Sequence, residues 1–117
     1  MWAAELKDDA RLVGYIGLAV PTWLPEVLPA VEVGWRLHPD EWGRGLATEG
    51  GRAALRYGFE EIDLDLILSM FVPENASSGR VMDKLGMIHH LTTTDPTSGG
   101  RLEVRAITRE AWQATQV

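Results

Sequence analysis

One stretch of the chain passes from a strand pattern through a glycine-containing turn into a helix pattern, and this succession most constrains the fold. Residues 30–38 alternate, with Val33 and Trp35 on one face and Glu32 on the other, which predicts a strand. Residues 46–62 carry apolar side chains at spacings of three and four, which predicts an amphipathic helix. Glycines at 43 and 45 permit a tight turn between the two elements. The pair therefore requires a sheet with a helix packed on one face.

The rest of the chain adds strands and a second helix. Residues 2–7 and 12–20 predict a hairpin whose second arm is apolar on both faces, as in a central strand. Three prolines mark residues 21–29 as a connection. The remaining predicted elements are a buried strand at 66–72, a helix at 75–85, and strands at 87–93 and 102–107. The order β-β-β-α-β-α-β-β predicts one α+β domain over residues 1–117, with a mixed sheet flanked by two helices.

The bulk properties exclude several classes of protein. A net charge of -6 argues against a nucleic-acid-binding surface, which is normally basic. The absence of cysteine excludes disulfides, zinc–thiolate sites and cysteine nucleophiles, and is compatible with a reducing cytoplasm. No apolar run reaches the roughly 18 residues that a membrane span needs, and the first five residues do not have the pattern of a signal peptide. The sequence therefore predicts a cytoplasmic protein with no membrane partner.

The turn before the first helix is a candidate anion site. It holds Gly43, Arg44, Gly45, Leu46, Ala47 and Thr48. The first N–H groups of a helix have no partner within the helix, so they can point at phosphate oxygens. Neither common phosphate motif fits, because Thr48 replaces the third glycine of GxGxxG, and Gly51 and Arg52 replace the Lys-Ser/Thr pair of a Walker A loop. The alternative is a plain glycine-containing strand–helix turn.

Two further polar residues, Ser78 and Glu32, are candidates for chemistry. Ser78 shares a face with Val81 and Met82, so its hydroxyl should point inward near the start of the second helix; the alternative is an ordinary capping cluster around Asn75. Glu32 lies in the middle of a predicted central strand, where a carboxylate is costly unless it is solvated or has a partner. The alternative is a solvent-facing position. The histidines at 38, 89 and 90 lack metal-ligand spacing, so no metal site is predicted.

Taken together, residues 31–37, 42–49 and 73–87 resemble the GNAT acetyltransferase family. Within that family they are similar to the branch of the RimJ/RimL ribosomal-protein N-acetyltransferases. Residues 2–20 also look like the second and third strands of the family. The segments follow the order and spacing of the family over essentially the whole chain. The resemblance implies a GNAT-like fold and acetyl-CoA as the co-substrate, with backbone N–H groups of residues 43–48 binding its pyrophosphate.

The resemblance also implies roles for individual residues. The strand end around Leu37 would splay from the strand at 66–72, with pantetheine in the opening and a backbone N–H near Leu37 polarising the thioester carbonyl. Asn75 would hydrogen-bond the pantetheine arm. Ser78 would protonate the departing thiolate, and Glu32 would take a proton from the acceptor amine. Two positions depart from common family residues, since Trp42 stands where Gln or Arg is frequent and Arg105 where Tyr is frequent.

The largest departure is at the start, because family members begin with a strand and two helices before the position of Trp2. The resemblance therefore predicts an N-terminally truncated domain, with Trp2, Leu6, Leu12 and Tyr15 as candidates for exposed surface and a homodimer as one way to cover it. Three readings remain open. The chain transfers acetyl to a primary amine, on a protein N-terminus or a small molecule; or it is a non-catalytic acyl-CoA-binding module or remnant; or it completes itself by pairing with another chain.

Overall fold

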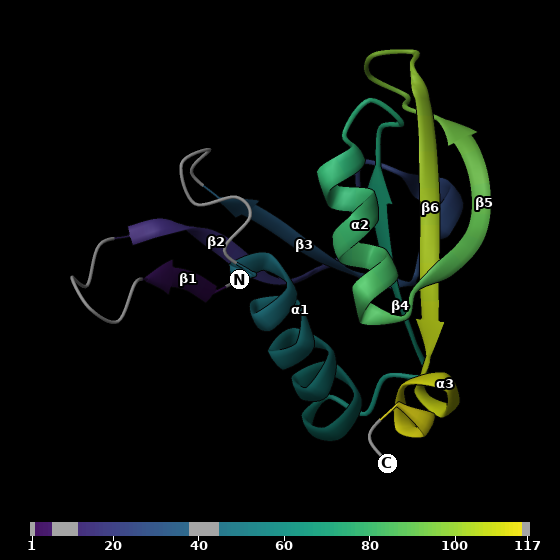
Figure 1. Cartoon of the computed structure of the whole chain (residues 1–117). Coiled ribbons are helices and arrows are strands. Elements are labelled where there is room, and N and C mark those ends of the chain that lie inside the picture. Colours follow the sequence, from purple (N-terminus) through teal and green to yellow (C-terminus); the bar gives the residue numbers. More distant parts are fainter. Residues whose placement is uncertain (1, 6–11, 38–44, 116–117) are drawn as a thin grey trace.

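The computed structural model describes residues 2–5, 12–37 and 45–115, which form a mixed sheet with helices on one face (Figure 1). The six strands follow the spatial order β1-β2-β3-β4-β6-β5. They are β1 (Trp2–Glu5), β2 (Leu12–Ala19), β3 (Val31–Leu37), β4 (Leu66–Phe71), β5 (Ile88–Thr94) and β6 (Arg101–Thr108). The α-helices are α1 (Leu46–Arg56), α2 (Ala76–Leu85) and α3 (Arg109–Ala114). The predicted α+β class and the order of the first eight elements are confirmed.

Strand direction divides the sheet into two groups. β1, β2 and β3 pair antiparallel with their neighbours, and so do β4, β6 and β5. The two groups meet where β3 pairs parallel with β4. A parallel neighbour requires a crossover connection, and α1 supplies it between β3 and β4. The predicted central position of residues 12–20 is confirmed, because β2 lies between β1 and β3.

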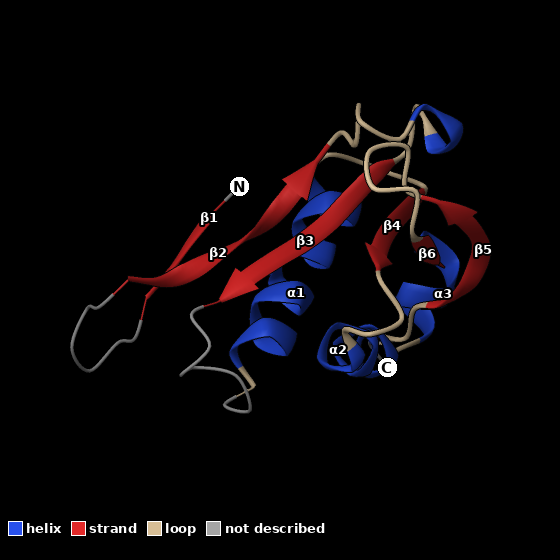
Figure 2. Ribbon diagram, turned by 90° about the horizontal axis from the view of Figure 1, so that it is seen from above, coloured by secondary structure: helices blue, strands red, loops and turns tan. Residues whose placement is uncertain are grey.

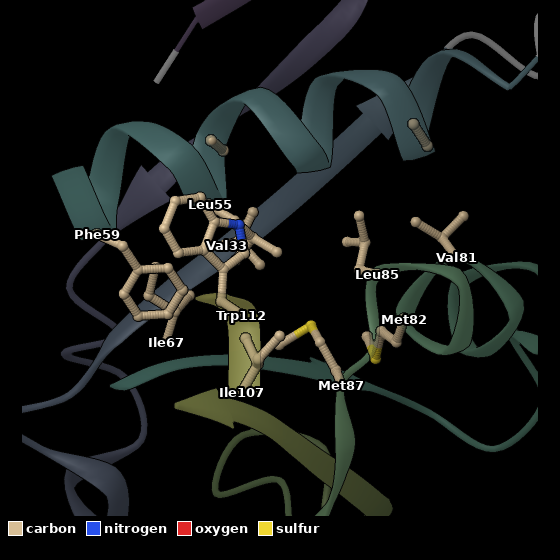
Figure 3. Close-up of a cluster of buried hydrophobic side chains, with 12 residues drawn as sticks. Val33, Leu55, Phe59, Ile67, Val81, Met82, Leu85, Met87, Ile107 and Trp112 are labelled. Atoms are coloured by element: carbon tan, nitrogen blue, oxygen red, sulfur yellow. The ribbon is translucent and has the colours of Figure 1, made fainter. Parts of the chain in front are cut away.

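The main core lies between the sheet and the two longer helices (Figure 3). α1 contributes Leu55, and α2 contributes Met82 and Leu85, against strand residues that include Val33 and Ile67. The helices approach closely because α1 carries Gly51, where a Cβ would lie 2.8 Å from Leu85 Cδ1. A smaller core covers the opposite face of the sheet. There Leu24 and Val27 pack on apolar side chains of β4 and β6.

Two predicted boundaries around the helices are wrong. The first helix does not run regularly to residue 62, because its last turn widens into the π-helix η3 (Tyr57–Glu61). A π turn takes an extra residue, so side chains beyond it leave the stripe that a period of 3.6 predicts. Ile62 is accordingly 47% exposed instead of buried. The connection at 21–29 contains the short 3-10 helix η1 (Pro25–Val27), which carries Val27 into the smaller core.

The two predicted flanking helices are present, and the structure contains a third helix that was not predicted. α3 follows β6 directly, and the Thr108 hydroxyl caps it by accepting a hydrogen bond from the Ala111 N–H at 3.1 Å. Its Trp112 stacks against Phe59 of η3, with ring centroids 5.3 Å apart. α3 therefore closes the end of the main core, where it lies below α2 and beside the C-terminal end of α1 (Figure 1).

Candidate active site

β3 and β4 diverge soon after they meet, and this divergence organises the candidate site. Only Val31 with Ile67 and Glu32 with Leu68 form register pairs, although β3 continues to Leu37 and β4 to Phe71. The Ser69 hydroxyl donates a 2.8 Å hydrogen bond to the Val33 carbonyl at the branching point. We call the diverging segments, residues 33–37 and 69–71, the β3–β4 fork. Figure 2 shows the two strands parting there.

The backbone of β3 presents polar groups to the fork. In an extended strand the N–H and C=O of one residue point to the same side, and the side alternates from residue to residue. The Val33 carbonyl faces Ser69 on β4. The backbone groups of Trp35 and Leu37 therefore face the same side, beyond the last residue pair with β4. A ligand in the fork would find donors and acceptors there.

The N-terminus of α1 follows β3 and has free amides. Gly45 takes a left-handed φ of 75° as the N-cap residue, and no side chain caps the helix. The first helical bond runs from the Glu49 N–H to the Gly45 carbonyl at 2.9 Å. The N–H groups of Leu46, Ala47 and Thr48 consequently have no partner inside the helix. Gly43 and Arg44, the other predicted residues of this loop, lie outside the described residues.

The N-terminus of α2 stands on the other side of the fork. The Asn75 side-chain carbonyl accepts a 3.3 Å hydrogen bond from the Ser78 N–H, which confirms Asn75 as the cap. No hydrogen bond between described residues uses the Nδ2 group of Asn75, so this donor is available. Ser78 is buried, and its hydroxyl oxygen accepts a 3.3 Å hydrogen bond from Trp35 Nε1. The inward direction predicted for Ser78 is confirmed.

Arg105 of β6 anchors the first turns of α2 to the sheet. Its Nη1 donates to the Gly79 carbonyl at 2.9 Å and forms an ion pair with Asp83. Its guanidinium also lies over the Phe71 ring, 4.9 Å from the centroid. Gly79 permits this close packing, because a Cβ there would lie 3.1 Å from Phe71 Cε2. Arg105 thus positions the helix that carries Asn75 and Ser78.

Glu32 lies apart from Ser78, on the opposite face of the sheet. It alternates with Val33, which faces α1, and it is half-buried beside η1. Desolvation by this burial raises the pKa of Glu32, and a hydrogen bond with the Trp23 side chain partly opposes the rise. The structure therefore brings Asn75, Ser78 and the β3 backbone together, and places the candidate base on the other side of the strand.

Trp35 is the residue that sequence reasoning did not assign to the site. It lies two residues after Val33 on the same face of the strand, which predicts a core-facing side chain, and it does pack against the main core. No local sequence pattern indicates its hydrogen bond to Ser78, because the two residues lie 43 positions apart in the sequence. An indole in a core position carries one N–H that needs a partner, and Ser78 is the buried hydroxyl that supplies it.

Within the described residues, no group of three or more histidine, aspartate and glutamate side chains is arranged to hold a metal ion. His89 and His90 are exposed on β5, and His38 lies outside the described residues. Among the helices of the described ranges, none combines the length and apolar character that crossing a bilayer requires.

Comparison with known proteins identifies the family. Residues 1–88 match the family model described as the acetyltransferase (GNAT) domain. The chain belongs to the GNAT acetyltransferase family. It is 45% identical over 82 residues to the N-acetyltransferase YnaD of Bacillus subtilis, a match that covers 70% of this chain and 46% of YnaD. It is 38% identical over 91 residues to the FsC-acetyl coenzyme A-N(2)-transacetylase of Aspergillus fumigatus, covering 73% of this chain and 39% of that protein.

Solved structures show the same fold. A GNAT-family acetyltransferase from Bacillus anthracis superposes with a TM-score of 0.77 at 30% identity, covering 92% of this chain and 65% of that one. The aminoglycoside acetyltransferase AAC(6')-Ib, solved in complex with coenzyme A, superposes with a TM-score of 0.78 at 23% identity, covering 93% of this chain and 66% of that one. GNAT acetyltransferases use acetyl-CoA as the acetyl donor. This GNAT chain spans about half the length of YnaD and less than two thirds of the Bacillus anthracis structure.

Proposed function

We propose that this GNAT chain binds acetyl-CoA in the β3–β4 fork and transfers the acetyl group to a primary amine. The observation that carries the proposal is the divergence of β3 and β4 after two residue pairs, between the N-termini of α1 and α2. A strand pair opened in this way leaves backbone hydrogen-bonding groups without partners. An amide-containing chain such as pantetheine can satisfy them.

The phosphate end of the ligand would lie at α1. The amides of Leu46, Ala47 and Thr48 have no helical partner, and the helix dipole places positive potential there. The loop residues Gly43 and Arg44 precede these amides and complete the proposed pyrophosphate contacts. On the other side of the fork, Asn75 Nδ2 is free to donate to a carbonyl of the pantetheine arm. The net charge of -6 does not oppose this contact, because local amides outweigh distant charges.

The proposed reaction is direct transfer. The amine nitrogen attacks the thioester carbonyl, and the resulting oxyanion accepts a hydrogen bond from the Leu37 N–H. The carbon–sulfur bond then breaks, and the thiolate leaves as a thiol because the Ser78 hydroxyl donates its proton while it regains one from solvent water. Because Ser78 accepts a hydrogen bond from Trp35, its own O–H is left to donate. Glu32, which lies on the other face of β3, accepts a proton from the amine through a water molecule.

The acceptor is proposed by chemical class only. The 38%-identical relative from Aspergillus fumigatus is by its name an N(2)-transacetylase, which supports an amine nitrogen as the acceptor. The motifs around Glu32 and Asn75 favour the branch similar to RimJ and RimL, for which the acceptor is a protein N-terminus. A small-molecule amine is the other member of the proposed class.

The test has two arms. Isothermal titration and a thermal scan with acetyl-CoA should show binding and a raised melting temperature. A panel of N-terminal peptides and small polyamines should then yield coenzyme A and an acetylated product. Binding without turnover on any amine would support the alternative, a non-catalytic acyl-CoA-binding module. Absence of both heat and a melting shift at high ligand concentration would reject the proposed fork site.

Pairing with a second copy is a subsidiary proposal. β1 is an edge strand that pairs on one side with β2. An edge presents unpaired N–H and C=O groups, which a second β1 can satisfy. Light scattering across a dilution series should show a dimer that dissociates on dilution. A mass equal to 13.0 kDa at all concentrations would contradict it.

A further inference from the structure

A second candidate binding site lies at the far end of the two long helices from the fork. A cavity of about 220 Å³ opens between the C-terminal halves of α1 and α2 and the end of α3. Its apolar lining comes from Leu55, Leu85 and Trp112. Its charged lining includes three cations, which are Arg52, Arg56 and Lys84. We call this cavity the cationic pocket.

The three cations converge because of helix geometry. Arg52 and Arg56 are four residues apart on α1, so they lie one turn apart on the same face. Lys84 comes from the last turn of α2, which packs against that face through the contact between Gly51 and Leu85. The pocket therefore gathers positive charge on a chain whose net charge is -6.

The three cations of the pocket are not paired with carboxylates of the described residues. Across residues 2–5, 12–37 and 45–115, no carboxylate forms an ion pair with Arg52, Arg56 or Lys84. Asp83 also lines the pocket, but its carboxylate is already paired with Arg105. The helix dipole at the end of α2 would oppose an anion. That opposition is reduced, because the Gly86 and Met87 N–H groups bond to two of the last four carbonyls of α2, those of Asp83 and Met82.

We propose that the cationic pocket binds a small phosphate-bearing anion, separately from acetyl-CoA. Two arginines can contact phosphate oxygens bidentately, and a lysine adds a third charge. The distance between the cationic pocket and the proposed acetyl-CoA site follows from the lengths of α1 and α2. At 1.5 Å per residue, Arg56 lies roughly 16 Å along the helix from Gly45, and Lys84 roughly 14 Å from Asn75. Trp112 in the lining favours a phosphate monoester that carries a ring.

The test uses inorganic phosphate and phenyl phosphate as probes on the whole chain. At matched ionic strength set with chloride, both should raise the melting temperature, and phenyl phosphate should bind more tightly. The double variant Arg52→Gln/Arg56→Gln should weaken phosphate binding at least tenfold in isothermal titration. Arg101→Gln is the matched control, because Arg101 is an exposed arginine at the start of β6, outside the pocket, and should leave the affinity unchanged. Equal affinities in the double variant and the parent would overturn the proposal.

A second arm tests the separation from acetyl-CoA. Phosphate should still bind when the chain is saturated with coenzyme A, and the double variant should bind coenzyme A and 3′-dephospho-coenzyme A as the parent does. If the double variant loses affinity for coenzyme A alone, the pocket holds the 3′-phosphate of that ligand and the separate site is refuted. If the parent chain does not bind acetyl-CoA, the proposed function is rejected, and the result for the cationic pocket still stands.

Discussion

The indole N–H of Trp35 on β3 donates a 3.3 Å hydrogen bond to the hydroxyl oxygen of Ser78 on α2. This bond joins β3 to the start of α2 through side chains, at the level where the backbones of β3 and β4 have parted. It occupies an acceptor position of Ser78 and leaves the hydroxyl hydrogen to point elsewhere. The contact therefore sets both the position and the donor direction of the residue proposed to protonate the thiolate.

Trp35→Phe should lower kcat by about fivefold to tenfold, the equivalent of one neutral hydrogen bond of about 1 kcal/mol. KM for acetyl-CoA should change little, because the ligand contacts of the fork remain. In a double-mutant cycle, Ser78→Ala should have almost no further effect on kcat in the Trp35→Phe background. Additive effects of the two substitutions would show that Trp35 acts only through packing.

Gly45→Val should abolish most coenzyme A binding, because a β-branched residue resists the φ of 75° that directs the first amides of α1. A Cβ at Gly45 would meet no atom within 4 Å, so the effect comes from backbone strain of about 1–2 kcal/mol. Gly99→Val is a matched control, since Gly99 has a φ of 77° and equally open surroundings in the β5–β6 turn. Both variants should lose similar stability, and only Gly45→Val should lose affinity in isothermal titration.

Glu32→Gln should lower turnover about 100-fold, within the range for a general base, with little effect on acetyl-CoA affinity. In the parent, turnover should rise with pH through the raised pKa of Glu32. The folded chain holds this proton more tightly than the unfolded chain. Stability should therefore be full below the ordinary glutamate pKa and fall as pH rises through the raised pKa. Glu32→Gln should remove this fall in melting temperature, whereas Glu60→Gln, an exposed charge control, should retain it.

Arg105→Met should lower the free energy of unfolding by about 1–2 kcal/mol, from the lost bond to the Gly79 carbonyl and the lost contact with the Phe71 ring. Asp83→Asn removes only the ion pair, whose carboxylate is mostly exposed, and should cost under about 1 kcal/mol. Urea unfolding of both variants measures the difference. Equal losses would mean that the ion pair, and not the anchoring of α2, carries the stabilisation.

Local patterns in the sequence predicted most of the fold. Alternation identified β3, and the apolar stripe identified α1, because neighbours in sequence decide both. The pattern failed where tertiary packing changes the local geometry. The π turn at Tyr57–Glu61 brings Gly58 against β4, where a Cβ would lie 2.7 Å from Ile67 Cδ1, and no periodicity reports that contact. α3 has six residues, which are too few to show an apolar periodicity, although threonine at 108 is a residue type that commonly caps a helix.

The site was predictable only where residues are close in sequence. The inward direction of Ser78 and the capping by Asn75 follow from positions within one helix start. The fork and the contact between Trp35 and Ser78 depend on strands and helices brought together across 30 or more positions. The resemblance to the family predicted the splayed strands, and composition alone did not.

The contact between Gly51 and Leu85 has a consequence for the ligand site. The two strand groups share only two backbone pairs, so the width of the fork depends on how closely α1 and α2 pack. Gly51 lets the two helices approach closely because it has no side chain. Alanine there would place a Cβ 2.8 Å from Leu85 Cδ1. We expect Gly51→Ala to widen the fork and weaken coenzyme A binding without touching the ligand, which isothermal titration against the parent would detect. The small size of Gly51 thus sets the spacing of the two helices that flank the proposed acetyl-CoA site.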